Sequence, residues 1–130
     1  MLACADARVD PAQIFGAEPG ALFVVRTAGN VACEHARESL AFAAALGVKA
    51  VVVLGHSDCG AVKDALSARP RLAATAAAIR AHLAGEDEPG AAARAHARRT
   101  AEEVRQALGG KVPVLAAYYR AESGEVEWLA

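Results

Sequence analysis

The sequence predicts an α/β fold built on a parallel sheet, organised as one domain over residues 1–130. The first observation is the alternation of short apolar segments with segments of helical length, the order that produces parallel strands joined by helices. The second is the run of Val51, Val52, Val53 and Leu54, because a continuous apolar stretch is typical of a strand buried on both faces.

The strands are expected where short segments gather Val, Leu, Phe, Tyr or Trp side chains. The first three residues form the stub of one such strand, since an apolar start runs directly into a polar motif. The expected strands cover residues 1–3, 22–26, 50–54, 112–119 and 126–129.

The helices are expected in the segments between these strands. In the last of them Val104 and Leu108 share one face and are surrounded by good helix formers, and the glycine pair Gly109 and Gly110 ends the pattern. The expected helices cover residues 38–46, 61–68, 72–83 and 92–108.

Composition excludes several classes of partner. The net charge is −1 and no basic run is longer than Arg98 and Arg99, so neither nucleic acid nor a membrane surface is an expected partner. No segment approaches the ~20 apolar residues of a membrane span, and no signal peptide precedes the first motif. Three cysteines in such a chain indicate reduced thiols or metal ligands, so we expect a cytoplasmic protein.

The polar motifs at the ends of two expected strands predict a metal centre. Cys4 follows the first strand, and His56 and Cys59 follow the third. Chemistry in open parallel sheets collects beyond the carboxyl ends of the strands, so we expect these three side chains to meet at one point. Two thiolates and one imidazole leave a fourth tetrahedral position open, which is the ligand count of a catalytic zinc rather than a structural one.

Asp6 and Arg8 are expected beside this centre. They lie two residues apart at a strand end, so the guanidinium can hold the carboxylate through two hydrogen bonds. An Asp held in this way stays ionised and can orient zinc-bound water. If the pair breaks, the same Asp can close the fourth metal position.

Each cysteine motif taken alone is a weak signal, because buried cysteine often acts as a small apolar side chain. The metal prediction therefore rests on the two motifs occurring together. Cys33 lacks ligand-like spacing and is expected to be structural, and His35 is expected in solvent at a helix start. His82 and His96 lie in polar helical stretches and are expected at the surface.

In three segments the chain resembles the β-class carbonic anhydrases: Cys-X-Asp-X-Arg from Cys4, Arg-Thr-Ala-Gly-Asn ending at Asn30, and His-X-X-Cys-Gly from His56. It looks like a short form that lacks the family's N-terminal helical arm. The resemblance implies a sheet order of 2-1-3-4 with an added edge strand and helices on both faces. It also implies zinc on the two cysteines and the histidine, beside an Asp–Arg dyad.

The resemblance implies reversible hydration of carbon dioxide to bicarbonate by zinc-bound hydroxide. By the same resemblance, Phe23, Ala28 and Phe42 fall where family members surround the carbon dioxide pocket, and the backbone N–H of Gly60 lies near the substrate oxygens. It further implies a homodimer or a larger homo-oligomer, which suits a chain that is 55% hydrophobic but only 5% aromatic.

Two alternatives to carbonic anhydrase activity stay open. Related proteins on this scaffold hydrolyse carbonyl sulfide or carbon disulfide, and pocket shape decides between these substrates. A zinc-stabilised subunit without catalytic activity is the second alternative, although a merely structural zinc has no need of an Asp6–Arg8 pair.

Overall fold

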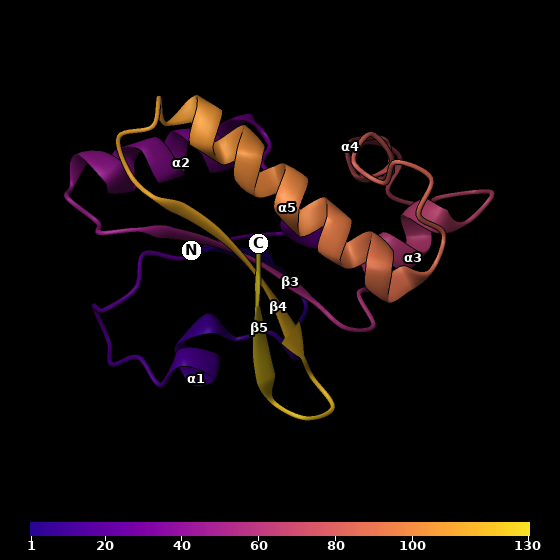
Figure 1. Cartoon of the computed structure of the whole chain (residues 1–130), viewed down its shortest axis with the longest axis horizontal. Coiled ribbons are helices and arrows are strands. Elements are labelled where there is room, and N and C mark those ends of the chain that lie inside the picture. Colours follow the sequence, from indigo (N-terminus) through magenta and orange to yellow (C-terminus); the bar gives the residue numbers. More distant parts are fainter.

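One five-stranded sheet organises the protein, with the strands in the order β2-β1-β3-β4-β5. Figure 1 shows β3, β4 and β5 of this sheet beneath the long helix α5. The computed structural model describes all 130 residues. Strands β2, β1, β3 and β4 are parallel, and β5 pairs with β4 in the antiparallel direction. The expected order and the added edge strand are both confirmed. The strands are β1 (Leu2–Cys4), β2 (Val25–Thr27), β3 (Val51–His56), β4 (Val114–Arg120) and β5 (Glu125–Leu129).

The β2 strand begins three residues later than the sequence suggested. Leu2 of β1 pairs with Val25, so residues 22–24 extend past the amino end of β1 and have no strand beside them. The apolar segment is present as expected, but the length of its neighbour decides which part of it is a strand.

Four helices correspond to the predicted ones, with changed boundaries. The longest begins earlier than predicted because Pro89 opens it and Glu88 caps it, accepting hydrogen bonds from the amides of Gly90 and Ala91 at 2.8 and 2.7 Å. None of the helices combines the length and the hydrophobicity that crossing a membrane requires. The four are α2 (Glu34–Ala45), α3 (Gly60–Leu66), α4 (Ala73–Arg80) and α5 (Pro89–Ala107).

Two short elements were not predicted. Helix α1 (Pro11–Phe15) has little more than one turn, capped by Asp10, and the 3-10 turn η1 (Ala28–Asn30) directly follows β2. Elements of this length bury too few side chains to create a periodic hydrophobic pattern, so neither was expected from periodicity.

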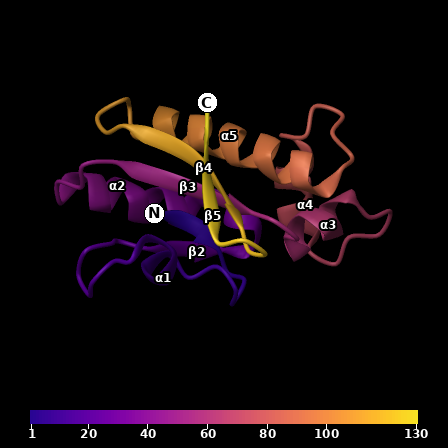
Figure 2. The same ribbon diagram turned by 60° about the horizontal axis from the view of Figure 1, so that its bottom comes forward.

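The sheet has two differently covered faces (Figure 2). Leu2 and Val53 pack in the core under α2 and α5, whereas Ala3 and Leu54 pack on the face that carries α1. This alternation follows from the two-residue period of a strand. Helices therefore lie on both faces, but α1 covers much less than the α2–α5 layer.

Helix α5 packs unusually close to the central strand. A side chain added at Gly55 in β3 would lie 3.1 Å from Ala97 Cβ and 3.2 Å from the carbonyl oxygen of Ala93. The alanine-rich surface of the helix and the glycine of the strand allow this approach. The layer of side chains between α5 and the sheet is therefore narrow at this contact. The same small side chains bring α5 near the carboxyl ends of the strands.

Candidate metal centre

Cys4, His56 and Cys59 meet at the carboxyl ends of two adjacent parallel strands. Cys4 ends β1 and His56 ends β3, while Cys59 caps α3 after a tight turn. Their potential ligand atoms all lie within 4.8 Å of one another, and all three side chains are buried. The meeting point that the sequence suggested is therefore present.

The imidazole of His56 is oriented as a metal ligand. Its Nδ1 donates a hydrogen bond to the carbonyl oxygen of Ser57 at 2.8 Å, which leaves the lone pair on Nε2. That Nε2 is fully buried and has no hydrogen-bond partner. A histidine that binds a metal through one nitrogen typically donates its other N–H to a carbonyl or carboxylate. The unpaired Nε2 therefore fits a metal ion between it and the two sulfur atoms.

The two thiols cannot both ionise without a cation. Interaction with the Cys59 thiol lowers the pKa of Cys4 to about 4, aided by the Gly29 amide, which donates to Cys4 Sγ at 3.3 Å. The same interaction, and then burial, raises the pKa of Cys59 well above its usual range. A divalent cation reverses this, because it compensates two thiolates. Two thiolates and one neutral imidazole form a donor set that suits zinc.

The Asp6–Arg8 pair lies beside this cluster. Asp6 Oδ1 accepts hydrogen bonds from the Arg8 amide at 2.8 Å and from Nε at 3.1 Å, and Oδ2 accepts one from a terminal guanidinium nitrogen at 2.7 Å. These bonds lower the pKa of Asp6 to about 2, so its carboxylate is ionised at neutral pH. Arg8 also binds Asp58 across the site, which holds the guanidinium in place. The carboxylate thus faces Arg8 and is not one of the three clustered donors.

Backbone contacts that the sequence did not reveal also hold the site. Arg26 in β2 donates to the carbonyl oxygen of Cys4 at 2.8 Å and to that of Asp6, so it ties β2 to the end of β1. Gly29 has a positive φ of 66°, and a side chain there would lie 2.9 Å from Ile79 Cδ1. Only glycine can therefore place its amide against Cys4. Both residues lie in the motif that carried the family resemblance, but their contacts require the neighbouring strands and helices.

The residues expected around the substrate separate into two groups. Ala28 packs against the buried cluster that contains Cys4 and Cys59, and Gly60 is the exposed first residue of α3. Phe23 and Phe42, in contrast, pair with each other at a ring distance of 6.4 Å near the amino ends of the strands. The structure does not bring these two rings to the metal cluster within one chain.

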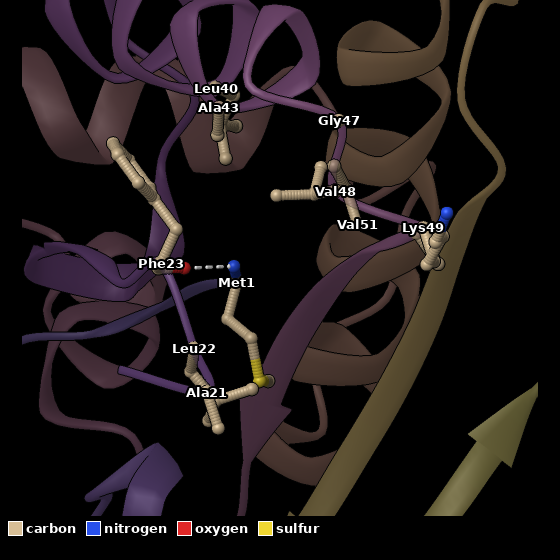
Figure 3. A pocket seen from close by; sticks show the side chains of 11 residues that line it. Met1, Ala21, Leu22, Phe23, Leu40, Ala43, Gly47, Val48, Lys49 and Val51 are labelled. Atoms are coloured by element: carbon tan, nitrogen blue, oxygen red, sulfur yellow. Dashed lines mark hydrogen bonds between the residues drawn. The ribbon is translucent and has the colours of Figure 1, made fainter. Parts of the chain in front are cut away.

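Phe23 instead lines an apolar pocket of about 330 Å³, at the end of β1 and β3 opposite to the cluster (Figure 3). The amino group of Met1 donates to the carbonyl oxygen of Phe23 at 2.6 Å, which fixes this rim. Leu40, Val48 and Val51 form much of the remaining wall.

The structure confirms the expected exposure of one of the other histidines and contradicts it for two. Cys33 and His35 are exposed at the start of α2 and take no part in the cluster. His82 and His96, expected at the surface, are 9% and 1% exposed, so that prediction was wrong. Charged residues two positions away in sequence, Arg80 and Arg98, are exposed, while the two imidazoles turn inward and stack on each other.

Comparisons with known proteins agree with this geometry. The sequence profile described as carbonic anhydrase matches residues 1–126. A carbonic anhydrase of Pseudomonas aeruginosa is 46% identical over 68 residues, which is 47% of this chain and 31% of that protein. The matched stretch is therefore less than a third of the curated relative.

Solved structures extend the likeness to nearly the whole chain. A Coccomyxa β-carbonic anhydrase, solved in complex with acetazolamide, superposes with a TM-score of 0.83 at 28% identity, over 98% of this chain and 69% of that one. A carbon disulfide hydrolase shares the fold with a TM-score of 0.69 at 21% identity, over 97% and 75% of the two chains. The cluster of Cys4, His56 and Cys59 is typical of the zinc site of β-carbonic anhydrases. With a matching profile over almost its full length and this donor set at the expected sheet edge, the chain belongs to the β-class carbonic anhydrase family.

Proposed function

We propose that this protein catalyses the reversible hydration of carbon dioxide to bicarbonate at a zinc held by Cys4, His56 and Cys59. The observation that carries the proposal is the buried Nε2 of His56, which has no partner and lies among two thiols at a sheet edge. Zinc bound there would supply a Lewis acid that polarises water and lowers its pKa.

The chain's own residues supply orientation and charge. Asp6 is ionised and acceptor-only, so it can hold a reacting water by one of its protons while Arg8 keeps the carboxylate from turning toward the metal. The bonds of Arg8 to Asp58 make this arrangement rigid. Gly60 opens α3 toward free space, since a side chain there would meet nothing within 4 Å, and its backbone N–H is proposed to bind a substrate oxygen.

We also propose that the active form is a homodimer or a larger homo-oligomer. Phe42 on α2 and Leu46 just after it are 60% and 64% exposed, and on the opposite face of the sheet Leu115 and Trp128 are exposed where α1 covers it only partly. Exposed apolar side chains that gather on a surface mark association sites. In a two-fold dimer the Phe23–Phe42 pair of one copy can wall the metal site of the other, which gives these residues the substrate role that they lack within one chain.

Metal content and turnover, measured on the same samples, test the proposed function. The purified protein is expected to hold one zinc per chain and to hydrate carbon dioxide in a stopped-flow assay. Cys59→Ala is expected to lose both properties, and Cys33→Ser, which removes an exposed thiol, is the matched control that retains both. Unchanged zinc occupancy in Cys59→Ala would contradict the ligand assignment.

Parallel assays with carbonyl sulfide and carbon disulfide address the alternative chemistry on this scaffold. Faster hydrolysis of either sulfur compound than hydration of carbon dioxide would replace the proposed substrate. One bound zinc with no turnover of any of the three would support the non-catalytic alternative. Sedimentation at micromolar concentration tests the oligomer: a monomer with full activity would show that the site needs no second copy.

A further inference from the structure

A buried pair of histidines lies outside the metal centre and has no part in the proposed reaction. His96 on α5 and His82, just after α4, stack with ring centroids 5.0 Å apart, and their Nδ1 atoms are 2.9 Å apart. His82 Nε2 lies 3.0 Å from Oε1 of Glu103, two helical turns beyond His96 on α5. These three side chains form a hydrogen-bonded array. The Glu103 side chain is 44% exposed, so this end of the array reaches the surface.

The other end of the array reaches a metal ligand through one residue. His96 Nε2 lies 2.8 Å from the carbonyl oxygen of Gly29, and the amide of Gly29 donates to Cys4 Sγ. Gly29 is held between Ile79 and Ala61 in a left-handed conformation, so a fixed carbonyl also fixes the direction of its N–H. That N–H bond stabilises the thiolate of Cys4.

The donor and acceptor roles along this array determine which imidazole nitrogens carry a hydrogen. A carbonyl oxygen only accepts, so His96 Nε2 must carry a hydrogen. Burial lowers the pKa of His96 to about 4, despite the opposing effects of Gly29, Glu103 and the Cys4 thiolate, so the ring is neutral and its Nδ1 accepts. His82 Nδ1 must then donate to it. This leaves His82 Nε2 facing a carboxylate, and only a further proton between them makes that contact a hydrogen bond.

We propose that His82, His96 and Glu103 form a positioning array for the metal site, in which an imidazolium at His82 pairs with Glu103 and a neutral His96 holds Gly29 against Cys4. The array rests on the proposed function in one respect, namely that Cys4 binds the metal. Both histidines are positioning residues, because neither touches the metal, the substrate or the reacting water.

A purely structural role for the pair predicts less. Two imidazoles in an alanine-rich interior need partners wherever they lie, and any partner satisfies that need. The array instead predicts a particular tautomer for His96, a particular charge for His82, and an effect on metal binding at a cysteine that neither ring contacts.

Nitrogen NMR of the zinc-bound protein tests the proton assignment. The chain contains four histidines, and exposed His35 provides an internal reference. At pH 7 we expect His96 as the neutral Nε2–H tautomer and His82 with hydrogens on both nitrogens. In Glu103→Gln the side-chain amide can donate to His82 Nε2, so His82 should become neutral while His96 keeps its tautomer. A neutral His82 in the unchanged protein, or a hydrogen on His96 Nδ1, would overturn the assignment.

Zinc affinity, measured by competition with a chelator, tests the positioning role. His96→Leu is expected to weaken zinc binding by about 10-fold or more, as is typical when a group behind a metal ligand is removed. His96→Gln keeps a donor for the Gly29 carbonyl and should restore most of the affinity. Thr100→Val is the matched control, since Thr100 is buried one turn further along α5 and its hydroxyl has no partner.

The thiolate-to-metal absorption of the cobalt-substituted protein should shift in His96→Leu and stay unchanged in Thr100→Val. Unaltered zinc affinity and cobalt spectrum in a folded His96→Leu would refute the positioning role. If that variant does not fold, the Gln variants and the NMR of the unchanged protein still decide. A protein that binds zinc but does not turn over carbon dioxide would contradict the proposed function and leave these readouts intact.

Discussion

His56 and His96 are both almost completely buried, yet their surroundings give them different chemistry. His56 ends a central strand and has one nitrogen bonded to Ser57, while the other faces two thiols without a partner. His96 lies on a helix, and both of its nitrogens are bonded, one to Gly29 and one to His82. The comparison shows that burial does not identify a metal ligand. An unpaired nitrogen among other potential ligands does.

The largest expected effect is at the unpaired nitrogen. His56→Ala should abolish stoichiometric zinc binding, because it removes one of three ligands and leaves only two thiols to hold the ion. Elemental analysis of the purified variant measures this. His35→Ala, at an exposed histidine, is the control that should retain the metal. Full zinc occupancy in His56→Ala would contradict the assignment of His56 as a metal ligand, since its unpaired nitrogen would then have no role in binding.

The next effect concerns the paired histidine and pH. Burial lowers the pKa of His96 to about 4 in the folded protein, below the 6.5 of a free imidazole. Between these values the unfolded chain binds a proton that the folded chain does not, so stability falls as pH falls from about 6.5 to 4. The full effect is on the order of 3 kcal/mol.

Denaturant unfolding at pH 7 and pH 4.5 checks this expectation. His96→Gln lacks the titrating group, so it should lose less stability over this interval than the unchanged protein. Other acid-sensitive groups, including the metal ligands, are common to both proteins and cancel in the comparison. Equal losses in the two proteins would show that His96 is not the source.

A smaller effect is expected beside the metal site. Asp6→Ala should lower carbon dioxide hydration by roughly 10–100-fold while zinc stays bound, because Asp6 orients the reaction and is not a ligand in this arrangement. Turnover and zinc content, measured together, separate the two roles. Loss of zinc in parallel with activity would place Asp6 among the ligands instead.

The smallest effect is at a buried atom that, like His56 Nε2, has no partner but lies away from any ligand cluster. Thr100 Oγ1 is buried and unpaired on α5. Thr100→Val replaces that hydroxyl with a methyl group of similar shape and should stabilise the protein by about 1 kcal/mol, because an unsatisfied hydroxyl no longer has to be buried. A rise in the melting temperature of a few degrees is the expected measurement. A lowered melting temperature would mean that the hydroxyl makes a contact of its own.

Local pattern was sufficient for the strands and for the metal cluster. The Val-rich segment before His56 and the apolar stub before Cys4 indicated buried parallel strands, and such strands place their carboxyl ends at one edge. Phe23 and Phe42 were assigned to the substrate by resemblance. Within one chain, the register of β2 and the contact between the two rings put them at the opposite edge of the sheet from the metal cluster.

The sequence by itself determined the α/β class and the donors that meet at the zinc site, because strands and the motifs that follow them are local patterns. The strand order came from the resemblance. Only the tertiary structure decided the fate of His82 and His96. Their partners come from η1, from α5 and from the segment after α4, which are distant in sequence and meet only in the folded protein. A polar residue in a helical segment rich in charged side chains is predicted to face solvent. Contacts with elements distant in sequence, which no local pattern encodes, decide which of these polar residues are buried instead.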